Sequence, residues 1–166
     1  AQLDRLGGAA WQARVARIKG RVRIMAEQLI KIAAQRETAR AETLVAPTGS
    51  FTEFCARFGF VETDDQMGAI EDVVNDLAAG RASDRLICGD VGFGKTEVAL
   101  RAAFIAAMCG YQVALVAPTT LLARQHGKLF QERFSGFPVN IGVLSRMTAP
   151  ADAKRIKADI ASGDVQ

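Results

Sequence analysis

The sequence predicts an α/β fold in which a three-layer domain with a parallel sheet follows one long basic helix. From residue 85 on, short apolar segments alternate with amphipathic segments of helical period, which is typical of parallel strands joined by right-handed crossovers. Before residue 43, apolar residues recur every three or four positions through a basic stretch, which indicates a single helix. A chain of 166 residues with 49% apolar content can fill one core but not two large ones.

The N-terminal stretch is predicted to form one helix of roughly 30 residues, about 45 Å long. Residues 11–40 carry eight Lys or Arg against two Glu, a net charge of +6, whereas the rest of the chain sums to −3. Any acidic partner is therefore assigned to this helix. The helix either packs on its own domain or serves as a docking or connecting helix. Its heptad seam consists of Trp11, Val15, Ile18, Val22, Met25, Leu29 and Ile32.

Residues 46–50 contain Pro and Gly, which break the helical pattern and predict a boundary there. A capping box of Thr63 and Gln66 then begins a helix that continues to Gly80. Strands are predicted at residues 85–88, 111–118 and 137–145, and helices at residues 95–109, 119–134 and 149–163.

The spacing G-x-x-x-x-G-K-T, from Gly89 to Thr96, follows the first predicted strand and opens a helix. Glycines let such a loop turn sharply and bring its N–H groups onto phosphate oxygens. Lys95 is placed to reach the β and γ phosphates, and the Thr96 hydroxyl to ligate Mg²⁺. The spacing alone does not choose among kinases, GTPases, transporters and motor ATPases.

Cysteine spacing and hydropathy limit the protein class. Cys55, Cys88 and Cys109 are odd in number and lack C-x-x-C spacing, which argues against a disulfide framework or a zinc site and fits a reducing cytosol. The most apolar run is interrupted by Arg101. We therefore expect a soluble, cytoplasmic protein with no membrane partner.

The stretches "GDVGFGKTEVALRAAF" and "VALVAPTTLLARQHGKLFQERF" resemble the first motor lobe of the bacterial transcription-repair coupling factor family, which are superfamily 2 double-stranded DNA translocases. "LDRLGGAAWQARVARIKGRV" resembles the end of that family's polymerase-interacting domain and the helix leading into the motor, and "FGFVETDDQMGAIEDVVNDL" the entry to its first RecA-like lobe. The resemblance implies a P-loop NTPase fold of the RecA-like type, whose sheet is incomplete here. It divides the chain into a tail of the preceding domain (1–8), a linking helix (9–42) and the N-terminal part of the first lobe (43–166).

The resemblance also implies residue roles. Gln66 occupies the position where such motors read the adenine edge, although the capping box alone also explains it, and either Phe58 or Phe60 stacks nearby. Thr119 and Thr120 are expected to hold phosphates of the DNA strand, with Arg146 as a further backbone contact. Lys95 and Thr96 are the expected catalytic residues, with Thr96 as the Mg²⁺ ligand. The implied ATP phosphate site consists of Gly89, Asp90, Val91, Gly92, Phe93, Gly94, Lys95 and Thr96.

The implied function is that of an ATP-dependent motor coupling stalled transcription to nucleotide excision repair. ATP and Mg²⁺ are the expected cofactors; double-stranded DNA, RNA polymerase and excision-repair proteins are the expected partners. The family's acidic metal-binding motif and arginine finger are not among these 166 residues, so we expect a piece of a longer protein that is inactive alone. Two alternatives stay open, a RecG-like branch-migration DNA helicase and a non-motor P-loop kinase.

Overall fold

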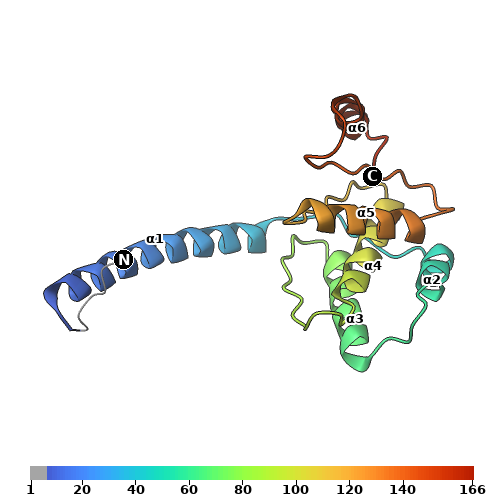
Figure 1. The fold of residues 1–166 in the computed structure, drawn as a ribbon. Coiled ribbons are helices and arrows are strands. Elements are labelled where there is room, and N and C mark those ends of the chain that lie inside the picture. Colours follow the sequence, from blue (N-terminus) through green and yellow to red (C-terminus); the bar gives the residue numbers. More distant parts are fainter. Residues whose placement is uncertain (1–6) are drawn as a thin grey trace. The chain divides into compact units, whose positions relative to one another are not determined.

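A computed structural model describes residues 7–166, in which helices alternate with irregular segments (Figure 1). The chain divides into two units, Ala1–Ala41 with Arg81–Ser83, and Glu42–Gly80 with Asp84–Gln166. Residues 1–6, which belong to the predicted tail 1–8, lie outside the described residues. From residue 7 to residue 166, none of the helices has the length and apolar character that a membrane span requires.

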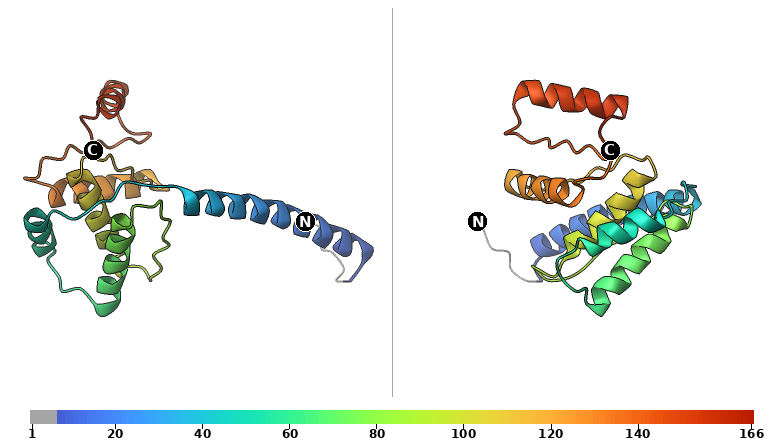
Figure 2. Two further views of the ribbon diagram at one scale, coloured as in Figure 1. Left: turned by 180° about the vertical axis from the view of Figure 1, so that it is seen from behind. Right: turned by 90° about the vertical axis from the view of Figure 1, so that its right-hand side faces the viewer.

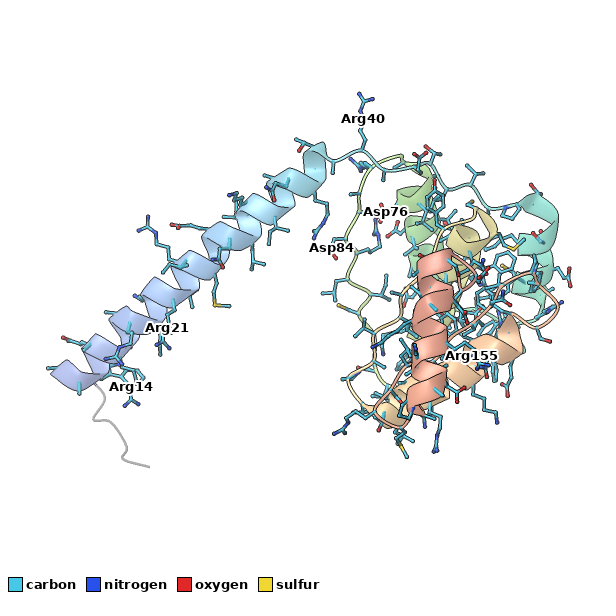
Figure 3. All side chains as sticks on the ribbon, turned by 90° about the horizontal axis from the view of Figure 1, so that it is seen from above. Arg14, Arg21, Arg40, Asp76, Asp84 and Arg155 are labelled. Atoms are coloured by element: carbon cyan, nitrogen blue, oxygen red, sulfur yellow. The ribbon has the colours of Figure 1, made fainter. Side chains whose placement is uncertain are left out.

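The first unit is dominated by α1 (Ala9–Thr38), which confirms the long N-terminal helix. None of its residues is buried, and Figure 3 shows side chains such as Arg14 and Arg21 projecting from it. The helix ends at Thr38, before the predicted residue 42, because Ala39 adopts an extended conformation. Beyond that point, Arg40 forms an antiparallel bridge with Arg81.

The second unit contains α2 (Thr48–Ala56), α3 (Asp64–Ala78), α4 (Lys95–Met108), α5 (Thr120–Arg133) and α6 (Pro150–Ser162). The last four confirm the predicted helices to within about two residues, the usual uncertainty of helix ends. Helix α2 was not predicted, because Pro47 and Gly49 read as a break. Pro47 instead stands at the N-cap position of α2.

Local capping explains where α3 and α4 begin and end. The capping box of α3 is confirmed, since the Thr63 side chain accepts from the Gln66 N–H while the Gln66 side chain accepts from the Thr63 N–H. Helix α4 ends at Met108, and Gly110, which follows the C-cap residue Cys109, has a left-handed φ of 85°. The N–H of Tyr111 then donates to the carbonyl of Ala106 at 3.0 Å, which closes the helix as a Schellman motif.

Helix α4 supplies most of the core. Phe104 is fully buried and stacks on Phe54 of α2, with ring centroids 4.3 Å apart. Phe134, which follows α5, contacts both rings at 5.1 and 5.8 Å. Three helices are thereby joined through aromatic side chains. The buried cluster consists of Phe54, Leu100, Ala103, Phe104, Ala107 and Phe134.

The predicted parallel sheet is not confirmed for the described residues. Segments 85–88, 111–118 and 137–145 contain no strand, and Figures 1 and 2 draw them as coil. Val113, Val139 and Ile141 do turn toward the core, as strand residues would. Residues of both segments, 112–115 with 139 and 141–144, line one cavity of about 370 Å³. These apolar side chains are therefore partly buried although their segments form no strand.

Helix α5 still packs closely on segment 137–145. A Cβ at Gly127 would lie 2.5 Å from a methyl carbon of Val143, and one at Gly142 would lie 2.7 Å from a methyl carbon of Ile156 in α6. Only glycine permits these two approaches. The segment that precedes Arg146 is consequently held between α5 and α6.

Candidate nucleotide site

The loop from Gly89 to Thr96 turns through two left-handed glycines and leads into α4. Gly92 and Gly94 have φ values of 89° and 70°, a left-handed backbone that glycine adopts without strain. Gly94 is the N-cap of α4, so the loop ends where the helix presents free N–H groups and a partial positive charge. That arrangement suits a bound phosphate.

Lys95 is held inside the loop. Its Nζ donates to the carbonyls of Gly89 at 2.7 Å and Asp90 at 2.5 Å. Phosphate oxygens are better acceptors for an ammonium group than these carbonyls, so a bound nucleotide can replace them. The lysine charge is therefore already positioned at the candidate phosphate site.

Thr96 follows in the first turn of α4 and is half-buried. Within residues 7–166, no group of three or more His, Cys, Asp or Glu is arranged to hold a metal ion. The Thr96 hydroxyl fits one position of a Mg²⁺ shell that is otherwise filled by phosphate oxygens and water, as Mg²⁺ prefers. The residues present thus fit a metal that binds together with the nucleotide.

Gln66 lies against the phosphate loop. Its Nε2 donates to the carbonyl of Phe93 at 2.8 Å, and its Oε1 accepts from the Thr63 N–H at 2.9 Å. A Cβ at Gly94 would lie 2.4 Å from the same Nε2. The Gln66 amide therefore joins the start of α3 to the loop, and both of its ends are engaged.

Phe58 and Phe60, the two residues predicted to lie near the adenine base, differ in how much of the ring is free to stack. The Phe58 ring lies 5.8 Å from the Arg101 guanidinium and 5.7 Å from that of Arg133. Phe60 is 78% exposed, and its ring lies 5.6 Å from that of Phe58. Phe60 consequently offers the free ring face that a stacking base needs.

A buried charge cluster lies behind the loop, and the sequence analysis missed it. Glu97 and Arg101 of α4 are 5% and 3% exposed. The Glu97 Oε1 accepts from the Arg101 Nε at 3.0 Å and from the Arg133 Nη2 at 2.9 Å. Arg101 also pairs with Glu62, next to the capping residue Thr63. The i, i+4 spacing of Glu97 and Arg101 was a signal for one pair, but nothing in the sequence marked Arg133 or Glu62 as partners.

Ionisation within the cluster favours the charged forms. The hydrogen bond from Arg101 lowers the pKa of Glu62 below its ordinary value. For Arg101, burial lowers the pKa, but the hydrogen bonds to Glu62 and Glu97 more than offset this, and the pKa is raised. Two arginines thus face two carboxylates, and the buried charges balance.

The predicted DNA-facing residues occupy two turns. Thr119 is the N-cap of α5, where its Oγ1 accepts from the Leu122 N–H at 3.2 Å, and Thr120 is the first residue of that helix. Arg146 is exposed in a turn in which the Ser145 N–H donates to the Thr148 Oγ1 at 2.9 Å. The common use of Arg146 and the two threonines in DNA binding stays a prediction.

Comparison with known proteins places this geometry in a family. Residues 63–165 match the DEAD/DEAH box helicase family. The chain is 44% identical over 169 residues to the transcription-repair-coupling factor of Rickettsia bellii and 45% identical over 165 residues to that of Haemophilus influenzae. It is covered to 99% in both cases but spans only 15% and 14% of those relatives.

A solved structure agrees with this placement. The structure of RecG bound to a three-way DNA junction superposes on 78% of the chain with a TM-score of 0.70 and 32% identity, covering 18% of that protein. These comparisons support the RecA-like helicase fold, although the described residues lack the paired strands. The chain is homologous to transcription-repair-coupling factors, and it belongs to the DEAD/DEAH box helicase family.

Proposed function

We propose that this chain is the ATP-binding part of a double-stranded DNA translocase that couples stalled transcription to nucleotide excision repair. The observation that carries the proposal is the loop from Gly89 to Thr96, which opens α4 with a left-handed glycine and a positioned lysine. Support also comes from the transcription-repair-coupling factors that match 99% of the chain. The whole activity belongs to the longer parent protein, because the chain spans about 15% of those relatives.

Within this proposal each residue has a role based on its position. Lys95 neutralises charge on the β and γ phosphates, Thr96 ligates Mg²⁺, and the loop N–H groups hold the phosphate oxygens. ATP, when bound, would supply the phosphoanhydride bond whose hydrolysis powers movement along DNA. Gln66 reads the adenine edge after releasing the Phe93 carbonyl, and Phe60 stacks on the base.

The DNA contact is proposed at the start of α5. Thr119 and Thr120 offer hydroxyl and N–H groups at a helix N-terminus, which suits a strand phosphate. Arg146 is proposed to add a further contact to the DNA backbone. RNA polymerase is the proposed partner of α1 and the segment before it, and excision-repair proteins are recruited by the parent.

The test uses the full-length parent with a duplex DNA. We expect ATP hydrolysis that DNA stimulates, and DNA binding that weakens as salt rises, since phosphate contacts release counterions. Lys95→Ala should abolish turnover while duplex binding without nucleotide persists. Turnover that survives Lys95→Ala would place ATP elsewhere and contradict the proposal.

A RecG-like fork helicase is the second candidate, favoured by the likeness to the RecG structure. This function requires the same ATP and DNA sites but does not involve RNA polymerase as a partner. Capture of the parent by RNA polymerase, lost on deletion of residues 1–42, supports the coupling function. Unwinding of branched DNA without polymerase capture supports the RecG-like function. The family match argues against the third candidate, a non-motor kinase.

A further inference from the structure

We propose that Arg133 is a positioning residue that links the ATP site to the DNA-facing end of α5. This inference rests on the proposed function, because it assumes that nucleotide binds at residues 89–96 and DNA at Thr119 and Thr120. It adds a role for a residue that touches neither ligand. Arg133 is the last residue of α5, and Thr120 is the first.

Arg133 is fixed at several points. Its side chain is 11% exposed, and its Nη2 donates to the Glu97 Oε1 at 2.9 Å and to the Phe54 carbonyl at 3.2 Å. The guanidinium also lies 4.7 Å from the Phe54 ring centroid and 5.7 Å from that of Phe58. One side chain of α5 is therefore held by α4, by α2 and by the segment that follows α2.

Glu97 connects this contact to the nucleotide. It is the residue after Thr96 and lies in the first turn of α4, directly after the phosphate loop. Its Oε1 is shared by Arg101, which also pairs with Glu62 beside the start of α3. Any shift of the loop or of the Gln66 turn on nucleotide binding is thus transmitted to the carboxylate that holds Arg133.

Helix α5 carries the shift onward. Its 14 residues span about 21 Å at 1.5 Å per residue, so displacement of its last residue moves the first as a rigid body. Thr119 caps that first turn through Leu122, which ties the DNA-facing loop to the helix. Arg133 is therefore the charged contact that attaches the DNA-side helix to the ATP-side cluster.

One hydrogen-bond donor of Arg133, the Nε, has no acceptor among the described residues. This nitrogen is buried. A buried, unsatisfied donor destabilises the arrangement that contains it. A small shift of α5 against α4 that gives this Nε an acceptor would remove that cost.

The experiment measures ATP turnover by the full-length parent with and without saturating duplex DNA. For Arg133→Gln we expect DNA stimulation to fall at least about fivefold, the lower end of typical coupling between sites. DNA-free turnover and the KM for ATP should stay within about twofold, because Arg133 touches no nucleotide. The matched control is Lys128→Gln on the same helix, whose exposed pair with Glu132 at 3.7 Å should leave stimulation unchanged.

Arg133→Lys provides the second variant in case Arg133→Gln does not fold. Lysine keeps the charge opposite Glu97 but cannot reproduce the planar guanidinium that also donates to Phe54 and faces two rings. We expect a folded protein, checked by thermal melting, with reduced DNA stimulation.

The possible results distinguish a failure of the Arg133 inference from a failure of the proposed function. Undiminished stimulation in Arg133→Lys, or equal losses with and without DNA in Arg133→Gln, would show that Arg133 is only a structural brace and overturn the inference. A wild-type parent whose ATP turnover ignores DNA would instead contradict the proposed function, and the coupling role with it.

Discussion

Two ion pairs in this molecule have the same length and spacing but different surroundings. In α1, the Arg23 Nε donates to the Glu27 Oε1 at 3.0 Å, and in α4, the Arg101 Nε donates to the Glu97 Oε1 at 3.0 Å. Both pairs span four residues. The α1 side chains are 83% and 61% exposed, whereas the α4 side chains are 4% and 6% exposed.

Burial determines how much each ion pair matters for the stability of the fold. An exposed i, i+4 pair is worth about 0.3–0.5 kcal/mol and is screened by salt. Removing one partner of a buried pair costs about 3–5 kcal/mol, because the other charge stays behind without compensation. Helix α1 is therefore a surface whose charges face solvent, and α4 is the scaffold that holds the nucleotide loop.

The largest expected effect comes from breaking each pair in turn. Arg101→Gln should lower the free energy of unfolding of the second unit by about 3–5 kcal/mol, because it leaves Glu97 and Glu62 with one arginine between them. Arg23→Gln should cost less than about 0.5 kcal/mol. Hydrogen exchange resolved by helix measures both, and equal losses in α1 and α4 would contradict the comparison.

Leucine truncation sharpens the comparison for apolar side chains. Leu100 of α4 is 1% exposed and Leu29 of α1 is 64% exposed. Leu100→Ala should cost about 2–5 kcal/mol through lost burial and a cavity. Leu29→Ala should change stability by less than about 0.5 kcal/mol. Urea unfolding of this chain checks both, and a large loss for Leu29→Ala would show that the seam of α1 is covered in solution.

Replacing a glycine by alanine should destabilise the loop before α4 but stabilise α1. Gly94→Ala places a Cβ 2.4 Å from the Gln66 Nε2 at a φ of 70°, so the loop must distort at a cost of about 1–2 kcal/mol. Gly20→Ala in α1 meets nothing within 4 Å and should stabilise the helix by about 0.8–1.0 kcal/mol. Nucleotide affinity reports the first change and circular dichroism the second. A Gly94→Ala protein that binds ATP normally would argue against the cradle.

The smallest effect is a pH dependence confined to the α4 cluster. The pKa of Glu62 is lowered by the hydrogen bond from Arg101, so the ionised form stabilises the folded state. This contribution is present above the ordinary Glu pKa of about 4.3 and is lost as pH falls through the lowered value. Glu62→Gln should thus be less stable than wild type at pH 7, and the difference should shrink below about pH 4.3. A difference that persists unchanged at pH 3 would contradict this assignment.

Local signals explain the parts of the fold that the sequence predicted. The capping box of Thr63 and Gln66, the heptad seam of α1 and the spacing of the phosphate loop each depend on residues within a few positions of one another. Short-range patterns fix helix ends and turn geometry, so these elements are present as expected. Helix α2 was missed because Pro47 stands where a helix can begin as well as where a segment can end.

Long-range partners explain the parts that the sequence did not predict. The predicted strands have the apolar pattern of a sheet, but pattern alone cannot show whether two backbones meet. The described segments 111–118 and 137–145 line a common cavity but form no strand. In the same way, Arg133 and Glu97 are 36 positions apart in the chain. Their contact follows from the packing of α5 on α4, which no local pattern encodes.

The central claim is that residues 89–96 are the ATP site of a DNA translocase, and movement along DNA tests it most directly. The measurement is displacement of a third strand from duplex DNA by the full-length parent, with ATP, comparing the wild type with Lys95→Ala. The account predicts displacement by the wild type and none by Lys95→Ala, although both bind the duplex. Equal displacement by the two proteins, or none by the wild type despite rapid ATP turnover, would contradict it.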